Sequence, residues 1–148
     1  MLVDFLTPEM IVVKKEINNW KEAVLAGGDL LKEAGMVEDE YKEKMLDKIK
    51  ANGPYIVIAS GLAIPHARPE AGVIKDAVSI LTLKDSVQFG HPEYDPVDII
   101  ITFAAKDIVA HNNLTKLIAE FLDSEKNLEV LRSAQDKKEI LDLIKGSV

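Results

Sequence analysis

Two stretches decide the fold: Ala77-Val78-Ser79-Ile80-Leu81-Thr82-Leu83 and Val97-Asp98-Ile99-Ile100-Ile101-Thr102-Phe103. Both are short, rich in β-branched residues and bounded by turn formers, a composition typical of buried strands. Tyr55-Ile56-Val57-Ile58 has the same character, and Ile11-Val12-Val13 is a candidate first strand. Because the central strands are apolar on both faces, the sequence predicts a sheet with helices covering both sides.

Helical patterns lie on either side of this strand-rich centre. The first follows Asn18 or Asn19 as its cap, and further helices are expected at 38–51, 110–122, 126–131 and 136–145. Gly27-Gly28 interrupts the first pattern. Each glycine costs a helix about 1 kcal/mol relative to alanine, so the pair predicts either close packing against another element or a break. The whole pattern indicates a layered α/β domain.

Length and composition fit one domain spanning residues 1–148. No repeat, low-complexity stretch or Pro/Gly-rich linker divides the chain, and its 148 residues are a typical single-domain length. The sequence contains no cysteine. This excludes disulfides, thiolate metal sites and thiol nucleophiles, so any step that needs a cysteine takes place on a partner.

The charge balance is acidic, with 18 basic against 25 acidic residues and a formal charge of −7. The lysines are interspersed with acidic residues and form no basic patch, so no nucleic-acid partner is predicted. No apolar run approaches the roughly 20 residues of a membrane span. The N-terminus lacks the basic start and the cleavage site of a signal peptide. We therefore expect a cytoplasmic protein.

The first chemical signal is Gly61-Leu62-Ala63-Ile64-Pro65-His66-Ala67-Arg68-Pro69-Glu70. Pro65 fixes its own φ and biases Ile64 towards an extended backbone, so His66 is presented from a stiff segment. Arg68 follows two residues later. An imidazole supplies an attacking nitrogen and a guanidinium supplies a fork of donors, so the pair suits an anionic phosphoryl group.

A second histidine, His111, lies in Ala110-His111-Asn112-Asn113 at the expected start of a helix. A helix start offers free N–H groups and the positive end of the dipole, which favour an anion. The same dipole lowers the pKa of a nearby histidine. If both histidines meet at one edge of the sheet, His66 is the candidate nucleophile. His111 is then a donor that steadies the transferred phosphoryl oxygens.

Structural interpretations of these residues stay open at this point. Either histidine is compatible with a structural role, and Arg68 with an ion pair to Glu70. His91, in the turn-rich loop 89–96, is expected to face solvent.

The remaining motifs argue against other chemistries. The three histidines, with Asp95 or Glu93, lack ligand spacing on a shared element, so no metal site is predicted. The sequence contains no Walker-type loop, no dinucleotide-binding fingerprint and no zinc-protease or serine-hydrolase motif.

Gly61-Leu62-Ala63-Ile64-Pro65-His66 resembles the phosphorylation-site motif of the mannitol/fructose-type IIA components of the bacterial sugar phosphotransferase system. A run of Gly, apolar, Ala, apolar, Pro and His is a hallmark of that family. The helix that opens with His111 lies where the second active-site histidine of the family is expected. The resemblance extends from Trp20 to the final helix, and residues 66–70 and 89–96 are most similar to the ascorbate-type subgroup.

The resemblance implies a phosphotransferase component with a phosphohistidine intermediate, built on a mixed five-stranded sheet flanked by helices. His66 would accept phosphate from the carrier HPr and donate it to a cysteine of a IIB component, which serves a membrane IIC component. His111 would correspond to the second histidine. No metal or organic cofactor is implied. Since this chain has no cysteine, the IIB acceptor is expected on another chain.

The sequence departs from the mannitol-type pattern in one respect. Relatives of that type carry an arginine roughly one helix turn upstream of the motif, where this chain has Lys48 and Lys50. Arg68 is the alternative replacement.

Two further expectations concern the surface that docks partners and the alternative functions. A shallow site surrounded by apolar residues would dock two partners, with Leu62, Ile64 and the helix at His111 as candidates. Three other functions stay open: a regulatory protein phosphorylated on His66, a metal-dependent hydrolase that uses all three histidines, and a purely structural interaction domain.

Overall fold

The computed structural model describes residues 1–146, so the last two residues of the predicted domain 1–148 lie outside the described part. Its strands are β1 Ile11–Lys15, β2 Val57–Ala59, β3 Leu62–Ala63, β4 Ala77–Val87 and β5 Val97–Ala104. They form one sheet in the order β1-β4-β5-β3-β2. β4 and β5 are antiparallel, β1 and β3 run parallel to their inner neighbours, and β2 is antiparallel to β3. This confirms the mixed sheet.

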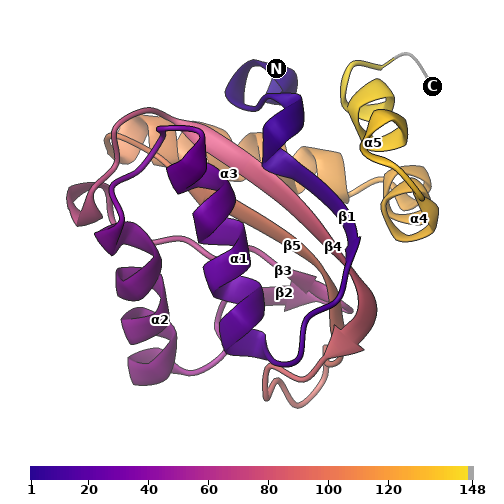
Figure 1. Ribbon diagram of the computed structural model, residues 1–148, viewed down its shortest axis with the longest axis horizontal. Coiled ribbons are helices and arrows are strands. Elements are labelled where there is room, and N and C mark those ends of the chain that lie inside the picture. Colours follow the sequence, from indigo (N-terminus) through magenta and orange to yellow (C-terminus); the bar gives the residue numbers. More distant parts are fainter. Residues whose placement is uncertain (147–148) are drawn as a thin grey trace.

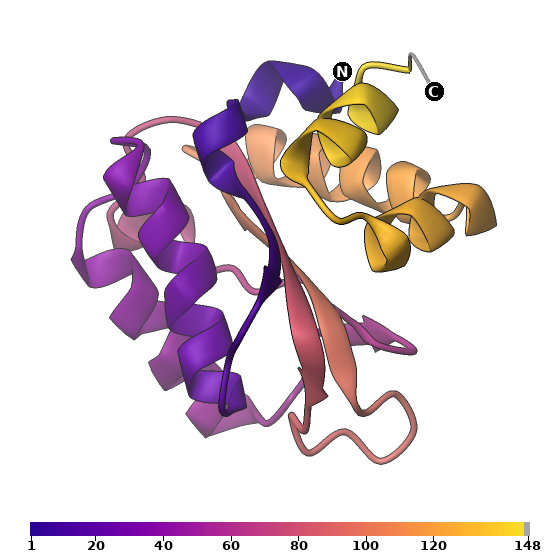
Figure 2. The same cartoon turned by 45° about the vertical axis from the view of Figure 1, so that its right-hand side comes forward.

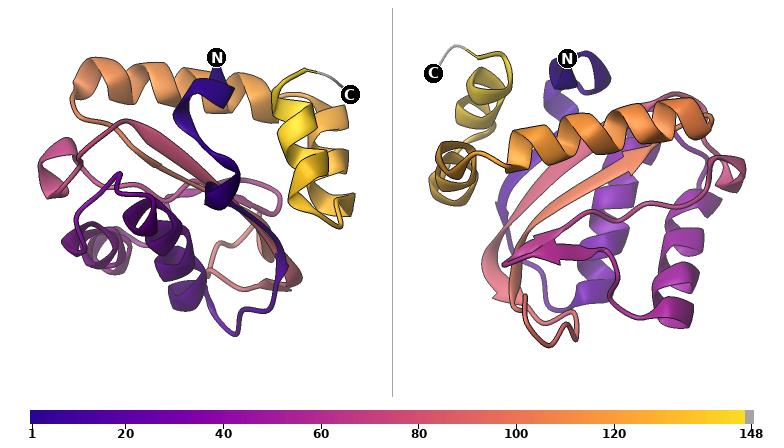
Figure 3. Two further views of the ribbon diagram at one scale, coloured as in Figure 1. Left: turned by 45° about the horizontal axis from the view of Figure 1, so that its top comes forward. Right: turned by 180° about the vertical axis from the view of Figure 1, so that it is seen from behind.

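Helices cover both faces of the sheet, as the apolar central strands predicted (Figures 1 and 2). α1 and α2 lie on one face, and α3, α4 and α5 lie on the other, where α3 crosses the strands (Figure 3). The helices are α1 Trp20–Glu33, α2 Glu40–Asn52, α3 Ile108–Leu122, α4 Glu125–Ser133 and α5 Lys137–Ile144, with 3₁₀ turns η1 Leu2–Phe5, η2 Pro8–Met10 and η3 Pro69–Ala71. None of the helices within residues 1–146 combines the length and hydropathy that a membrane span requires.

Side chains at the helix starts decide where the helices begin. The side-chain oxygen of Asn19 accepts a hydrogen bond from the Glu22 N–H, and that of Asp107 accepts one from the Ala110 N–H. Such caps satisfy N–H groups that have no partner within the helix. Because Asp107 is the cap, α3 begins at Ile108, two residues before the start that the sequence pattern indicated.

The segment that leads to His66 contains a strand that the sequence pattern did not indicate. Leu62 and Ala63 form β3 and pair with Ile99 and Ile100 of β5. Leu62 is only 3% exposed, so the expectation that it belongs to a docking surface is wrong. Its side chain is taken up by the core because β3 lies inside the sheet, between β5 and β2.

The glycine pair in α1 marks close packing and not a break. α1 is continuous through Gly27 and Gly28, and both are buried. A Cβ atom added at Gly27 would lie 2.2 Å from Oγ1 of Thr102 on β5. The Gly27 carbonyl also accepts a hydrogen bond from the Ser79 hydroxyl of β4. Gly27 therefore sets how closely α1 approaches the centre of the sheet.

We predict that Gly27→Ala lowers the free energy of unfolding by about 2 kcal/mol, because overpacking outweighs the gain of about 1 kcal/mol in helix propensity. Chemical denaturation measures the change. Adding Thr102→Ala should restore part of the loss, since it removes the nearest clashing atom. A Gly27→Ala protein more stable than the wild type would contradict this packing.

Candidate active site

His66 lies on the segment that follows β3. The Phe103 N–H donates a hydrogen bond of 3.2 Å to the Pro65 carbonyl oxygen, so this segment stays attached to β5 up to the residue before His66. The His66 side chain is half-buried. Its backbone is thus fixed by the sheet while one side of its ring remains accessible.

One hydrogen bond determines which nitrogen of His66 carries the proton. Nδ1 lies 2.8 Å from the carbonyl oxygen of Ile64. A carbonyl only accepts hydrogen bonds, so Nδ1 carries the proton. In the neutral ring the lone pair is then on Nε2. The backbone therefore leaves Nε2 as the nitrogen with the free lone pair.

Three rings surround the His66 imidazole. Phe103, at the end of β5, stacks on it with 4.7 Å between ring centroids. His111 approaches edge-on at 5.3 Å, and Tyr55 does so at 6.2 Å. The two histidines that the sequence singled out, 45 residues apart, therefore meet at one place.

The surroundings hold both histidines in their neutral form. Burial lowers the pKa of His66 to about 4, partly opposed by the hydrogen bond to Ile64, while the charges of Lys48 and His111 lower it further. Burial also lowers the pKa of His111, and the Lys48 charge adds to the effect. The lowered pKa of His111 agrees in direction with the expectation from the sequence, and burial and the Lys48 charge are its causes.

A cavity of about 470 Å³ opens beside the two histidines. Lys48 and Arg68 both line it, together with Asp107 and Ile108 at the start of α3. Arg68 is exposed, and within residues 1–146 no ion pair or hydrogen bond engages its side chain, so the alternative pairing with Glu70 is not formed. The cavity thus has two cations beside two neutral imidazoles, with the acidic residues Glu70 and Asp107 also in its lining.

Of the two upstream lysines, only Lys48 belongs to this site. It is half-buried, and its Nζ lies 5.3 Å from the centre of the Tyr55 ring. Lys50 is exposed and is not part of the cavity lining. The two lysines have different environments because they are two residues apart on α2, which places them about 200° apart around the helix axis.

The apolar residues beside the site come from the start of α3. Ile108 is 65% exposed and Val109 is 75% exposed, although both are large and apolar. Ile64 is half-buried. Exposed apolar side chains therefore lie just before His111, at two positions that the sequence did not single out, whereas Leu62 is buried.

His91 has a structural setting of its own. It is half-buried, not fully solvent-facing as expected, and its ring stacks on Tyr94 with 4.5 Å between centroids. Its Nδ1 accepts hydrogen bonds from the N–H groups of Glu93 and Tyr94. Within residues 1–146, no group of three or more His, Cys, Asp or Glu side chains is arranged to hold a metal ion.

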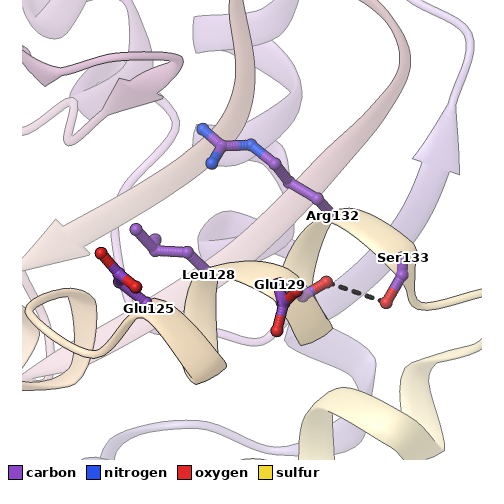
Figure 4. A pocket seen from close by; sticks show the side chains of 5 residues that line it. All are labelled: Glu125, Leu128, Glu129, Arg132 and Ser133. Carbon is purple, nitrogen blue, oxygen red and sulfur yellow. Dashed lines mark hydrogen bonds between the residues drawn. The ribbon is translucent and has the colours of Figure 1, made fainter.

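A second cavity, of about 520 Å³, lies along α4 and contains none of the predicted site residues (Figure 4). Its lining is Glu125, Leu128, Glu129, Arg132 and Ser133. Arg132 donates hydrogen bonds to the Asp98 carboxylate and to the Ser60 carbonyl oxygen. This arginine therefore ties α4 to the β2–β3 turn and to the start of β5.

Several residues of the site had no signal in the sequence. Phe103 and Tyr41 matched only the pattern of core residues, and Tyr55 was expected within a strand. Asp107 precedes the expected helix start. Only a search for an N-cap residue three positions before Ala110 would have found Asp107. An N-cap side chain accepts a hydrogen bond from the backbone N–H three residues later.

Fold and site together define a class of protein: a small α/β domain that can hold an anionic group on a neutral, backbone-oriented histidine. The comparisons agree with this class. The sequence matches the family described as "Phosphoenolpyruvate-dependent sugar phosphotransferase system, EIIA 2" over residues 4–147.

Relatives of known name and structure extend the match. The ascorbate-specific EIIA component of Salmonella choleraesuis is 45% identical over 135 residues, which cover 90% of this chain and 88% of that protein. The cryptic mannitol-specific enzyme IIA of Escherichia coli has a TM-score of 0.87 at 29% identity, over 99% of both chains. A chain in the Escherichia coli complex of mannitol enzyme IIA with phosphorylated enzyme IIB has a TM-score of 0.84 at 29% identity, over 95% of this chain and 97% of that chain.

The chain therefore belongs to the EIIA 2 family of the phosphoenolpyruvate-dependent sugar phosphotransferase system. It is a phosphotransferase component, a carrier of phosphoryl groups within that system.

The lowered pKa of His66 predicts acid sensitivity. Its pKa is about 4 in the folded protein, against 6.5 for a free histidine. Between these values the unfolded chain binds the proton and the folded chain does not, so stability is full above pH 6.5 and falls as the pH falls towards 4. We expect wild type to lose about 2 kcal/mol more unfolding free energy than His66→Gln between pH 7 and pH 5.

Urea denaturation of both proteins at the two pH values measures this difference. The subtraction removes the contribution of the other titrating groups, which the two proteins share. Equal losses in wild type and variant would show that His66 titrates as a free histidine does.

Proposed function

We propose that His66 carries the phosphoryl group, which it receives from phosphorylated HPr and donates to the cysteine of a IIB component of an ascorbate-type transporter. The observation that supports this most directly is the hydrogen bond from Nδ1–H to the Ile64 carbonyl, which leaves the Nε2 lone pair free. The proposed partners and location follow the family: a cytoplasmic domain of residues 1–148, with the IIC component reached only through IIB.

The first transfer is an exchange between two nitrogens. The Nε2 lone pair of His66 attacks the phosphorus of the donor phosphohistidine and forms a new N–P bond. The donor N–P bond breaks, and its electron pair returns to the donor imidazole. The His66 ring keeps its Nδ1 proton and becomes cationic, and the bond to Ile64 stabilises that charge. No water, metal or organic cofactor takes part in this balance.

The charge of the moving group is met by side chains in the 470 Å³ cavity. Arg68 has no competing partner within residues 1–146 and can offer two donors to phosphoryl oxygens. Lys48 supplies a second positive charge, and it takes the place of the upstream arginine of mannitol-type relatives. His111 is a candidate donor to a third oxygen. Positioning and charge neutralisation of this kind account for most of phosphoryl-transfer catalysis.

Two lines of support favour the proposed partners. The Salmonella relative is named as ascorbate-specific, and a mannitol relative was solved in complex with its phosphorylated IIB protein. The exposed pair Ile108 and Val109 offers apolar docking surface next to the site. Because a IIA component receives phosphate from HPr and donates it to a IIB component, one shallow surface must accept these two partners in turn.

We predict that incubation with enzyme I, HPr and phosphoenolpyruvate adds the mass of one phosphoryl group to the wild type and none to His66→Ala. Intact mass spectrometry measures the gain, and His91→Ala is the matched control that should be phosphorylated normally. Phosphate on His66→Ala would refute the assignment.

The same labelled protein identifies the acceptor. Phosphate should pass to an ascorbate-type IIB protein faster than to a mannitol-type one. Transfer to neither, with normal loading from HPr, would favour the regulatory alternative.

We predict that Arg68→Ala and Lys48→Ala each slow transfer from HPr about tenfold, since a charge-assisted contact contributes about 1.5 kcal/mol. Rapid-quench kinetics measures the rates. Lys50→Ala removes the same charge outside the cavity and should match the wild type. A wild-type rate in either of the first two variants would remove that residue from the site.

A further inference from the structure

The Tyr41 hydroxyl lies between the two backbone segments that form the site. Tyr41 is the second residue of α2 and is completely buried. Its oxygen accepts a hydrogen bond of 2.9 Å from the Ala67 N–H. The hydroxyl has one proton to donate and two carbonyl oxygens within reach: that of Phe103 at 2.8 Å and that of Ala67 at 3.4 Å. The shorter contact indicates that the proton is donated to Phe103.

The register of β3 and β5 explains why this position matters. Leu62 pairs with Ile99 and Ala63 with Ile100, so continuing the pairing places His66 opposite Phe103. In this parallel ladder the N–H of every second β5 residue bonds to the carbonyl before the residue it pairs with. Accordingly Ile99 N–H donates to the Gly61 carbonyl. Phe103 N–H likewise donates to the Pro65 carbonyl.

The next bond of the ladder would run from the Ala67 N–H to the Phe103 carbonyl. In its place stands the Tyr41 hydroxyl, which is bonded to both groups. The two strands are therefore held apart on one side of His66 and joined directly on the other. This opening lets the His66 ring stack on Phe103 and reach the Ile64 carbonyl with Nδ1.

We infer that Tyr41 is a positioning residue for phosphoryl transfer: its hydroxyl, inserted into the β3–β5 ladder, holds the His66 imidazole in the orientation that exposes Nε2. This inference rests on the proposed role of His66 as carrier. Tyr41 itself touches no reacting atom. Its burial raises the pKa of the phenol, so the proton needed for the bond to Phe103 is present at physiological pH.

Loss of the hydroxyl has two possible structural consequences, and both disturb His66. Either the Ala67 N–H and the Phe103 carbonyl remain buried without a partner, or the segment closes onto β5 to form the direct bond. Closure would rotate His66, which lies between Pro65 and Ala67. Misplacement of reacting groups by about 1 Å is enough to slow a positioned reaction by up to about a hundredfold.

The test is Tyr41→Phe, which removes only the hydroxyl, with Tyr94→Phe as the matched control on the 89–96 loop. For Tyr41→Phe we expect kcat for phosphoryl transfer from HPr to fall at least about tenfold per folded molecule, with KM for HPr unchanged. Nitrogen-15 NMR should also show that the proton on His66 is no longer confined to Nδ1. Tyr94→Phe should match the wild type in every measurement.

The outcomes separate this inference from the proposed function. A folded Tyr41→Phe protein with wild-type kcat and an unchanged His66 tautomer would overturn the role of Tyr41 and leave the carrier role intact. A wild type that takes no phosphate on His66 would overturn the carrier role itself. If Tyr41→Phe does not fold, an ester in place of the peptide bond between His66 and Ala67 removes the N–H that donates to the Tyr41 hydroxyl. The same loss of kcat is expected, and a wild-type kcat would overturn the inference.

Discussion

The hydrogen bond between His66 Nδ1 and the carbonyl oxygen of Ile64 is the constraint on which the site depends. It joins a ring to a backbone group only two residues away, so it is available only if the intervening Pro65 holds a conformation that turns the carbonyl towards the ring. The bond fixes the tautomer and the direction of the free lone pair. In the proposed phosphorylated state, the same contact would stabilise the positive charge of the ring.

Around this bond, burial of the imidazole is balanced against access to the cavity. Phe103 covers one face of the imidazole and lowers the pKa through burial, while the other side opens into a cavity with Lys48 and Arg68. Full burial would keep out a partner, whereas full exposure would leave the ring partly protonated near neutral pH. Although the chain has a formal charge of −7, two cations, Lys48 and Arg68, line this cavity together with the acidic residues Glu70 and Asp107.

The sheet supplies the rigidity that this balance needs. The segment before His66 continues β3 alongside β5, and Gly27 brings α1 close to the same strand at Thr102. α2 contributes Tyr41 and Lys48 from one face, and α3 contributes His111 from the opposite side of the sheet (Figure 2). A relative with 29% identity retains this fold with a TM-score of 0.87, which is expected when backbone packing, more than individual side chains, defines the architecture.

The sequence by itself determined the layered α/β class, because β4 and β5 are apolar on both faces, and it singled out His66, Arg68 and His111 through local motifs. It left Lys48 and Lys50 undecided, since a helix face is chosen only by what packs against it. It missed β3, whose two residues are too few for a periodic pattern, and it placed Leu62 at the surface. Tertiary structure alone brought Phe103 and Tyr41 to the site, because the contacts of Phe103 with His66 and of Tyr41 with Ala67 join segments 26 or more residues apart. Such contacts cannot be inferred from the spacing of residues along the chain.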